Sequence, residues 1–197
     1  MSDRETELPF AVMVATLKKA VAALRDANVP YLLGGGLAIW ARGGPERDHD
    51  LDLMVKEEDA DRALQALADA GMKPEKPPEG WLYKAYDDND VMVDLIYRPT
   101  ENPVTDEMLE RGEELEVMAI QVNVMAAEDV FVSKLLALRE HELDYRSLIE
   151  MTRAVREQID WADVRQRTES SPFARAFFTL AEGLELVEPL PDKASTT

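Results

Sequence analysis

The chain has 197 residues, of which 46% are hydrophobic and 31% charged, a composition typical of one globular domain, or of one domain with a small appendage. It contains no cysteine and two histidines, which excludes disulfides, thiolate metal sites and a cysteine nucleophile and disfavours a histidine-rich zinc site. The net charge of -18 argues against nonspecific nucleic-acid binding, which depends on Lys and Arg, and it favours either a cationic partner or substrate or simply high solubility.

Hydrophobic spacing predicts helices alternating with strands in the first part of the chain. Apolar residues at three- and four-residue steps predict a helix over 8–26, which is followed by the helix-stopping segment Asn28-Val29-Pro30. The next predicted elements are a buried strand (31–33), a short helix (37–42), a strand (51–55) and a helix (57–70). They are followed by a proline-rich loop (74–80), a hairpin (81–87 and 91–98) and two short strands (115–118 and 120–124).

From residue 126 onward the pattern becomes helical. Four helices are predicted, over 126–140, 143–158, 161–167 and 172–184. The predicted fold class is therefore α+β: a small mixed β-sheet core with flanking helices over 1–125, and a helical C-terminal region over 126–197 packed on that core.

The N-terminal residues lack the basic and then apolar layout of a signal peptide. No apolar run approaches the roughly 20 residues needed to cross a bilayer. We therefore expect a cytoplasmic protein without a membrane partner.

A glycine turn followed by paired carboxylates is the most informative motif of the sequence. Gly34-Gly35-Gly36 precedes a short helix, after which Asp50 and Asp52 flank one apolar residue. Side chains two residues apart in a strand project to the same face, and like charges at that distance need a cation, such as a hard divalent ion. A glycine turn lets backbone N–H groups approach a phosphate. The pattern predicts a site for a metal and a nucleotide.

Asp94 is a carboxylate inside the apolar strand 91–96, where an unpaired charge is costly. Taken alone, it could be a salt-bridged residue at a sheet edge. Beside Asp50 and Asp52, it instead completes a two-metal Mg²⁺ site that can activate an attacking hydroxyl and neutralise a leaving pyrophosphate. Asp94 would be the general base or a ligand of the activating metal.

The segment 33–38, the Asp50-Leu51-Asp52-Leu53 motif and Asp94 together resemble the nucleotidyltransferase superfamily of DNA polymerase β. The resemblance implies a small mixed sheet with helices and Mg²⁺-dependent transfer of a nucleoside monophosphate from an NTP, with release of pyrophosphate. Gly35 and Gly36 would approach the phosphates, while the choice among ATP, CTP, GTP and UTP stays open. Arg47, next to the carboxylate strand, is a further candidate because a forked guanidinium suits triphosphate oxygens.

The segment 127–139, followed by Asp144-Tyr145-Arg146, resembles the helical part of the AbiEii and MenT-type nucleotidyltransferase toxins. In that group a lysine at the place of Lys134 and an acid at the place of Asp144 belong to the active site. Lys134 would offer a point charge to the triphosphate. The structural alternatives are a solvated helix lysine for Lys134 and a helix N-cap for Asp144.

Three functions are considered for this chain. The first is a toxin of a toxin–antitoxin pair, which would modify an RNA 3′ hydroxyl, of tRNA in particular, and bind a cognate antitoxin. The alternative is an aminoglycoside or lincosamide nucleotidyltransferase, because 34–42 fits the Gly-Gly-Gly-x-Ala-Ile-x-Ala-Arg stretch of those enzymes and a polycationic acceptor suits a chain of charge -18. A catalytically idle nucleotide-binding protein is the third, and the intact set of three aspartates argues against it.

Overall fold

The computed structural model describes residues 10–45, 50–100 and 102–189. The chain divides into two compact units, one comprising Met1–Ala41 with Glu46–Ala126 and the other Arg42–Pro45 with Ala127–Thr197. Within the described ranges, no helix is both long enough and apolar enough to cross a membrane.

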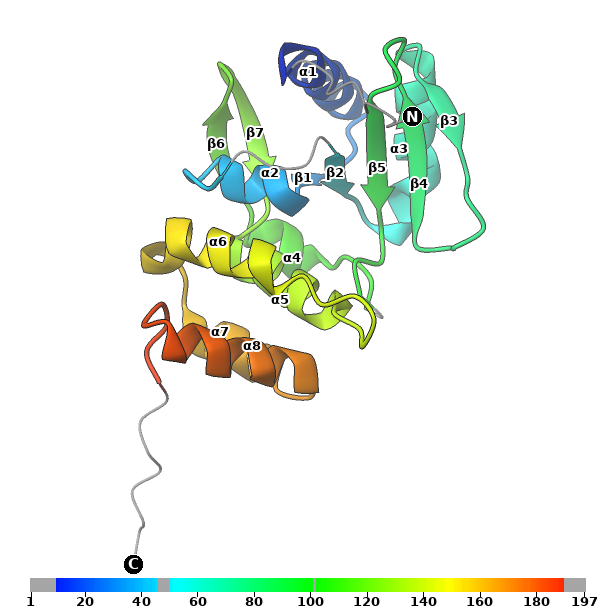
Figure 1. The fold of residues 1–197 in the computed structure, drawn as a ribbon. Helices are drawn as coiled ribbons and strands as arrows, with labels where there is room; N and C mark the ends of the chain where they lie inside the picture. Colours follow the sequence, from blue (N-terminus) through cyan, green and yellow to red (C-terminus); the bar gives the residue numbers. More distant parts are fainter. Residues whose placement is uncertain (1–9, 46–49, 101, 190–197) are drawn as a thin grey trace, which may run out of the picture. The chain divides into compact units, whose positions relative to one another are not determined.

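The first unit contains one mixed sheet of seven strands in the order β3-β4-β5-β2-β1-β7-β6 (Figure 1). The strands are β1 (Leu32–Leu33), β2 (Leu51–Met54), β3 (Lys73–Glu75), β4 (Leu82–Tyr86), β5 (Met92–Ile96), β6 (Glu113–Val117) and β7 (Ile120–Val124). The pairs β2·β5 and β1·β7 are parallel and the other neighbouring pairs are antiparallel. This confirms the predicted α+β class with a mixed sheet.

Helices lie on both sides of this sheet (Figure 1). The helices of the first unit are α1 (Phe10–Asp26), α2 (Gly35–Trp40), α3 (Ala60–Asp69), preceded by the 3-10 turn η1 (Glu57–Asp59), and α4 (Asp106–Glu110). In Figure 1, α2 lies in front of the sheet and α3 lies behind β4 and β5, which it contacts. Leu17, Val21 and Leu24 of α1 are buried, as the helical spacing predicted.

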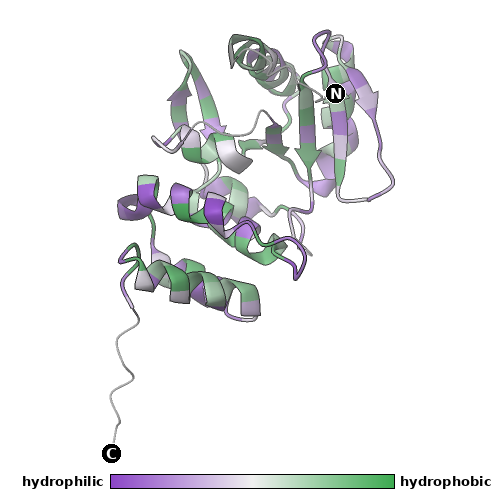
Figure 2. Cartoon of the chain, in the orientation of Figure 1, coloured by the Kyte–Doolittle hydropathy of each residue, from purple (hydrophilic) through white to green (hydrophobic). Residues whose placement is uncertain are grey.

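Two elements of the first unit were not predicted. The segment Lys73–Glu75 is an edge strand, although the sequence predicted a proline-rich loop from residue 74. Pro74 is tolerated there because an edge strand leaves one row of N–H groups unpaired. All three residues are exposed and the strand is hydrophilic (Figure 2). The short helix α4 is capped by Thr105, whose hydroxyl accepts a hydrogen bond of 3.3 Å from the Met108 N–H.

The predicted hairpin around residues 88–90 is confirmed, with β4 antiparallel to β5. Asp87 organises its turn: Oδ1 accepts from the N–H groups of Asn89 and Val91, at 2.8 Å and 2.9 Å. Its other oxygen accepts a hydrogen bond from the Thr16 hydroxyl of α1. Asp87 therefore stabilises the turn by hydrogen bonds within it and also links the turn to α1.

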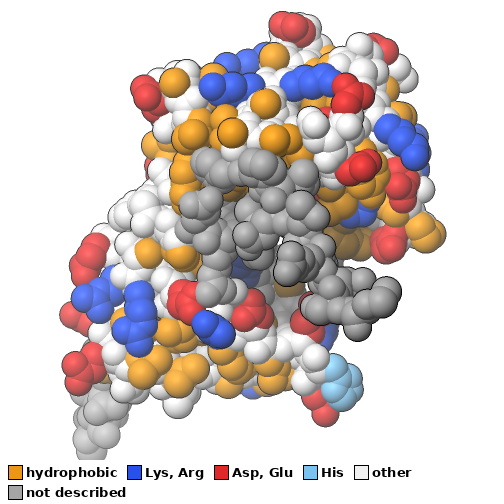
Figure 3. Space-filling view, turned by 45° about the horizontal axis from the view of Figure 1, so that its top comes forward, with side chains coloured by type: hydrophobic (Ala, Val, Ile, Leu, Met, Phe, Trp, Pro, Cys, Tyr) orange, Lys and Arg blue, Asp and Glu red, His pale blue; other side chains and the backbone are white. Residues whose placement is uncertain are grey.

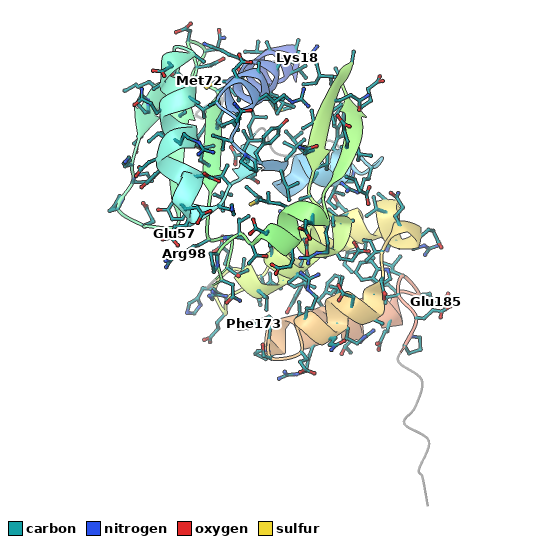
Figure 4. The ribbon with its side chains drawn as sticks, turned by 180° about the vertical axis from the view of Figure 1, so that it is seen from behind. Lys18, Glu57, Met72, Arg98, Phe173 and Glu185 are labelled. Atoms are coloured by element: carbon teal, nitrogen blue, oxygen red, sulfur yellow. The ribbon has the colours of Figure 1, made fainter. Side chains whose placement is uncertain are left out.

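An ion pair joins the two segments that follow the parallel strands β2 and β5. The Arg98 guanidinium donates two bonds of 2.8 Å and 3.1 Å to the two oxygens of Glu57, and Figure 4 shows the two residues side by side. Forked pairs of this kind fix geometry as well as charge. The pair therefore helps to hold the relative position of the two strands.

The second unit is helical, as predicted from residue 126 onward. It contains α5 (Ala127–Ala137), α6 (Tyr145–Val155), η2 (Arg156–Gln158), α7 (Trp161–Arg167) and α8 (Pro172–Gly183). Phe131 and Phe177 are fully buried, and Trp161 meets Phe131 edge-on with ring centroids 4.9 Å apart. The buried Asp129 carboxylate is paired with the Arg167 guanidinium, which compensates the cost of burying its charge.

Candidate functional site

Three chemistry-bearing side chains lie in one row across neighbouring strands of the first unit. Asp52 of β2 is the register partner of Asp94 on the parallel strand β5. On its other side, Asp94 is the register partner of Lys84 on β4. Register partners project to the same face of a sheet, so the row presents a carboxylate, a carboxylate and an ammonium side by side. Asp50 immediately precedes β2 and is exposed.

Asp94 is buried, with 8% of its surface exposed, and its Oδ1 accepts a bond of 3.0 Å from Lys84 Nζ. Burial raises the pKa of the Asp94 carboxyl, the negative charge of Asp50 acts in the same direction, and the Lys84 ammonium opposes both. A carboxylate with a raised pKa is a stronger base, and its pKa lies closer to neutral pH, as suits a group that accepts a proton during catalysis.

Lys84 is the side chain that pairs with Asp94. Burial alone would lower the pKa of its ammonium, but the hydrogen bond and charge of Asp94, together with the charge of Asp50, outweigh burial and raise it. Lys84 is therefore a fixed positive charge that faces the carboxylates.

The glycine turn lies directly against Asp52. The Gly34 N–H donates to the Asp52 carbonyl oxygen at 2.8 Å, so this N–H belongs to the sheet. Gly35 has φ +57, and a Cβ added to it would lie 1.8 Å from Asp52 Oδ2. Only glycine fits here, because the backbone is left-handed and the carboxylate occupies the place of a side chain. Gly35 and Gly36 form the first turn of α2, whose N–H groups have no partner within the helix.

The carboxylates of Asp50, Asp52 and Asp94 supply the oxygen donors that Mg²⁺ prefers, so the chemistry of the donor set fits this ion. Among the residues that the structure describes, however, no three Asp, Glu, His or Cys side chains are gathered as a metal-binding group. A cation is already present beside one of these carboxylates, because Lys84 Nζ lies 3.0 Å from Asp94 Oδ1.

The second unit brings Lys134 and Asp144 together. Both line a pocket of about 220 Å³, to which Ser147 also contributes. Asp144 is the N-cap of α6, and its Oδ1 accepts a bond of 3.0 Å from the Ser147 N–H, as in the structural alternative for this residue. Lys134 lies in the last turn of α5 and is half-buried. Arg47 lies outside the described residues.

Sequence reasoning missed Lys84, although a signal for it was present. The predicted hairpin turn is centred on Asn89, so residues five before and five after the centre face each other. This register places Lys84 opposite Asp94, as the structure shows.

Three solved structures have a similar fold. The solution structure of the antibiotic-resistance factor ANT(2″)-Ia matches with a TM-score of 0.59 at 19% sequence identity, over 89% of this chain and 96% of that one. A crystal structure of ANT(2″)-Ia with adenylyl-2″-tobramycin matches with a TM-score of 0.59 at 17% identity, over 86% of this chain and 98% of that one. The lincomycin-bound lincosamide antibiotic adenylyltransferase LnuA matches with a TM-score of 0.50 at 16% identity, over 70% of this chain and 92% of that one.

At these identities the likeness shows the fold alone, and a comparison with curated proteins finds no match. The sequence itself carries the assignment to a family. Residues 5–186 match the family described as "Uncharacterised nucleotidyltransferase", and the chain therefore belongs to this family of nucleotidyltransferases.

Proposed function

We propose that the protein transfers a nucleoside monophosphate from an NTP to the hydroxyl of a small, amine-bearing acceptor, and that Mg²⁺ is required. The observation that carries the proposal is the register pair of Asp52 and Asp94 on adjacent parallel strands, with the backbone of Gly35 against the Asp52 carboxylate. In this proposal the catalytic core is the region 1–125, followed by the helical region 126–197.

Each residue of the row has a role in this proposal. Asp50 and Asp52 would hold the metal, and Asp94 would be its third ligand or the general base. Bound there, Mg²⁺ would make the acceptor hydroxyl more acidic and neutralise charge on the phosphates. The N–H groups of Gly35 and Gly36 would bind phosphate oxygens. We keep Arg47 as a further candidate ligand of the triphosphate, and Lys134 and Asp144 as nucleotide-binding candidates that rest on the resemblance to the toxins alone.

In the reaction, the acceptor oxygen forms a bond to the α-phosphorus, the bond from that phosphorus to the β-phosphate oxygen breaks, and pyrophosphate leaves. The proton of the hydroxyl passes to a carboxylate oxygen of Asp94. The burial that raises the pKa of Asp94 suits this role, because a carboxylate of ordinary pKa is a weak base at neutral pH.

Two observations support a cationic small-molecule acceptor. The net charge of -18 attracts amines and repels polyanions. On the face seen in Figure 3, the Lys and Arg side chains of the described residues are scattered among Asp and Glu and form no continuous basic patch. Two of the matched structures hold a small molecule, adenylyl-2″-tobramycin in ANT(2″)-Ia and lincomycin in LnuA, and this supports a small-molecule acceptor.

An RNA acceptor is the second candidate, and one observation favours it. Lys134 and Asp144, the residues that carry the resemblance to the AbiEii and MenT-type toxins, line a common pocket in the second unit. In this candidate function the acceptor is a tRNA 3′ end and the partner is an antitoxin protein. Neither the family nor the matched structures support the RNA or the antitoxin.

The test uses each of the four NTPs labelled at the α-phosphate, with Mg²⁺, and offers an aminoglycoside and lincosamide panel in one reaction and total tRNA in another. We expect label on an amine-bearing drug. Asp52→Asn should lower the rate by at least about 100-fold, because replacing even a residue that only hydrogen-bonds to a metal ligand typically lowers activity 10–100-fold. Asp88→Asn, an exposed aspartate in the hairpin turn, is the control and should keep the wild-type rate.

Label on tRNA and on none of the small molecules would overturn the acceptor proposal in favour of RNA. Transfer by Asp52→Asn at the wild-type rate would overturn the site itself. In a parallel reaction with NTP labelled at the γ-phosphate, transfer of the γ label without the α label would show phosphoryl rather than nucleotidyl transfer.

A further inference from the structure

The aspartate row extends beyond Asp94 to the edge of the sheet. Across β2, β5, β4 and β3, the register partners are Asp52 with Asp94, Asp94 with Lys84, and Lys84 with Glu75. Lys84 is the cation of this row and has carboxylates as neighbours on both sides. Its position is set by the backbone register of the hairpin, so it cannot leave the row without a change in strand pairing.

The Lys84 ammonium is held in place rather than solvated. Nζ lies 3.0 Å from Asp94 Oδ1 and 3.0 Å from the Met92 sulfur, and the exposed fractions of the Lys84 and Asp94 side chains are 22% and 12%. Water therefore screens this ion pair less than it screens a surface pair. The same ammonium is close enough to Asp50 for the two charges to interact.

We propose, resting on the function above, that Lys84 is an internal counter-ion that competes with the divalent cation for Asp94 and thereby sets the metal affinity of the site. It is a positioning residue, since it acts through the Asp94 carboxylate. A metal ion bound to Asp94 would share one carboxylate with the ammonium on Oδ1, and the two positive charges would repel each other at short range.

This role makes a prediction opposite to that of a ligand-binding lysine. A lysine that binds phosphate or the acceptor weakens binding when it is removed. A counter-ion that competes with the metal strengthens metal binding when it is removed, because the remaining carboxylates repel each other until a cation joins them. The sign of the change in metal affinity therefore distinguishes the two roles.

The experiment measures Mn²⁺ binding to the full chain without nucleotide, from the electron paramagnetic resonance signal of free Mn²⁺. Lys84→Met should bind Mn²⁺ about tenfold more tightly than wild type, the order expected from one unit charge at short range. Lys84→Arg keeps the charge and should bind as wild type does. Lys76→Met removes a lysine that pairs with Asp61 at the surface, and it should also bind as wild type does.

A double-mutant cycle with Asp94→Asn tests the route of the effect. The gain from Lys84→Met should largely disappear in the Asp94→Asn background. Unchanged or weaker Mn²⁺ binding by Lys84→Met would overturn the proposal, as would a full gain in the Asp94→Asn background. Weaker NTP binding by Lys84→Met with unchanged Mn²⁺ affinity would also overturn it and make Lys84 a phosphate ligand.

These outcomes are separate from those of the labelled-NTP assay. Wild-type transfer that depends on Asp52, combined with unaltered Mn²⁺ affinity in Lys84→Met, would leave the proposed function intact and reject the role of Lys84. Thermal unfolding of each variant checks that the fold is retained, and Lys84→Arg provides the folded comparison at the same position.

Discussion

Gly35 is the residue whose identity the site geometry restricts most. Its backbone is left-handed and its Cα faces the Asp52 carboxylate so closely that a Cβ would overlap Oδ2. The sequence predicted that this glycine approaches a phosphate. It did not predict the contact with Asp52, because that contact depends on the pairing of β1 with β2.

Gly35→Ala should displace the Asp52 carboxylate and reduce transfer by about 100-fold, as expected when a reacting group moves by roughly 1 Å. The matched control is Gly43→Ala, whose φ of +90 gives similar backbone strain but whose added Cβ meets nothing within 4 Å. The control should lose about 1–2 kcal/mol of stability and keep its rate. Equal rates in the two variants, measured with labelled NTP, would contradict this account of Gly35.

At the scale of elements, the hairpin of β4 and β5 brings Lys84 to Asp94, and Asp87 organises its turn. Burial alone would raise the pKa of the Asp87 carboxyl, but hydrogen bonds from Thr16, Val91 and Asn89 outweigh it and lower that pKa. A lowered folded-state pKa means that the carboxylate stabilises the fold above its unfolded value of about 3.9. This stabilisation is lost as pH falls through the folded-state pKa.

Asp87→Ala should lower the free energy of unfolding by about 1–3 kcal/mol at neutral pH, the usual cost of leaving donors unpaired. The difference from wild type should shrink below about pH 4, because the unfolded wild-type chain then takes up a proton that the folded carboxylate binds only at lower pH. Urea unfolding at several pH values measures both. Asp88→Ala, the exposed neighbour, should cost less than about 0.5 kcal/mol. If the loss of unfolding free energy in Asp87→Ala stayed the same down to acid pH, the hydrogen bonds of Asp87 would not depend on its charge, which would contradict this account.

Elements with a strong local signal were predicted and those without one were missed. The hairpin was predicted because polar turn residues separate two apolar runs, and α1 because its spacing is regular. The edge strand β3 was missed because Pro74 reads as a loop residue, while its pairing with β4 is a tertiary interaction. The helix α4 has five residues, too few for a periodic pattern.

At the scale of the whole molecule, the resemblance of the glycine turn and the three aspartates to the DNA polymerase β superfamily predicted a nucleotidyltransferase, and the family match confirms that activity class. The acceptor is harder to predict, because acceptor choice depends on side chains from many segments rather than on a short motif. Net charge is a property of the whole surface, and it favours a cation without naming one.

The central claim is that Asp50, Asp52 and Asp94 bind the divalent cation together. Anomalous scattering at the manganese edge, from crystals of the full chain grown with Mn²⁺ and an NTP analogue that cannot be cleaved, locates the ion directly. We predict manganese within about 2.5 Å of carboxylate oxygens of all three aspartates, and none there in Asp52→Asn. Manganese bound elsewhere in the wild-type protein, with Asp94 still paired to Lys84, would contradict the claim.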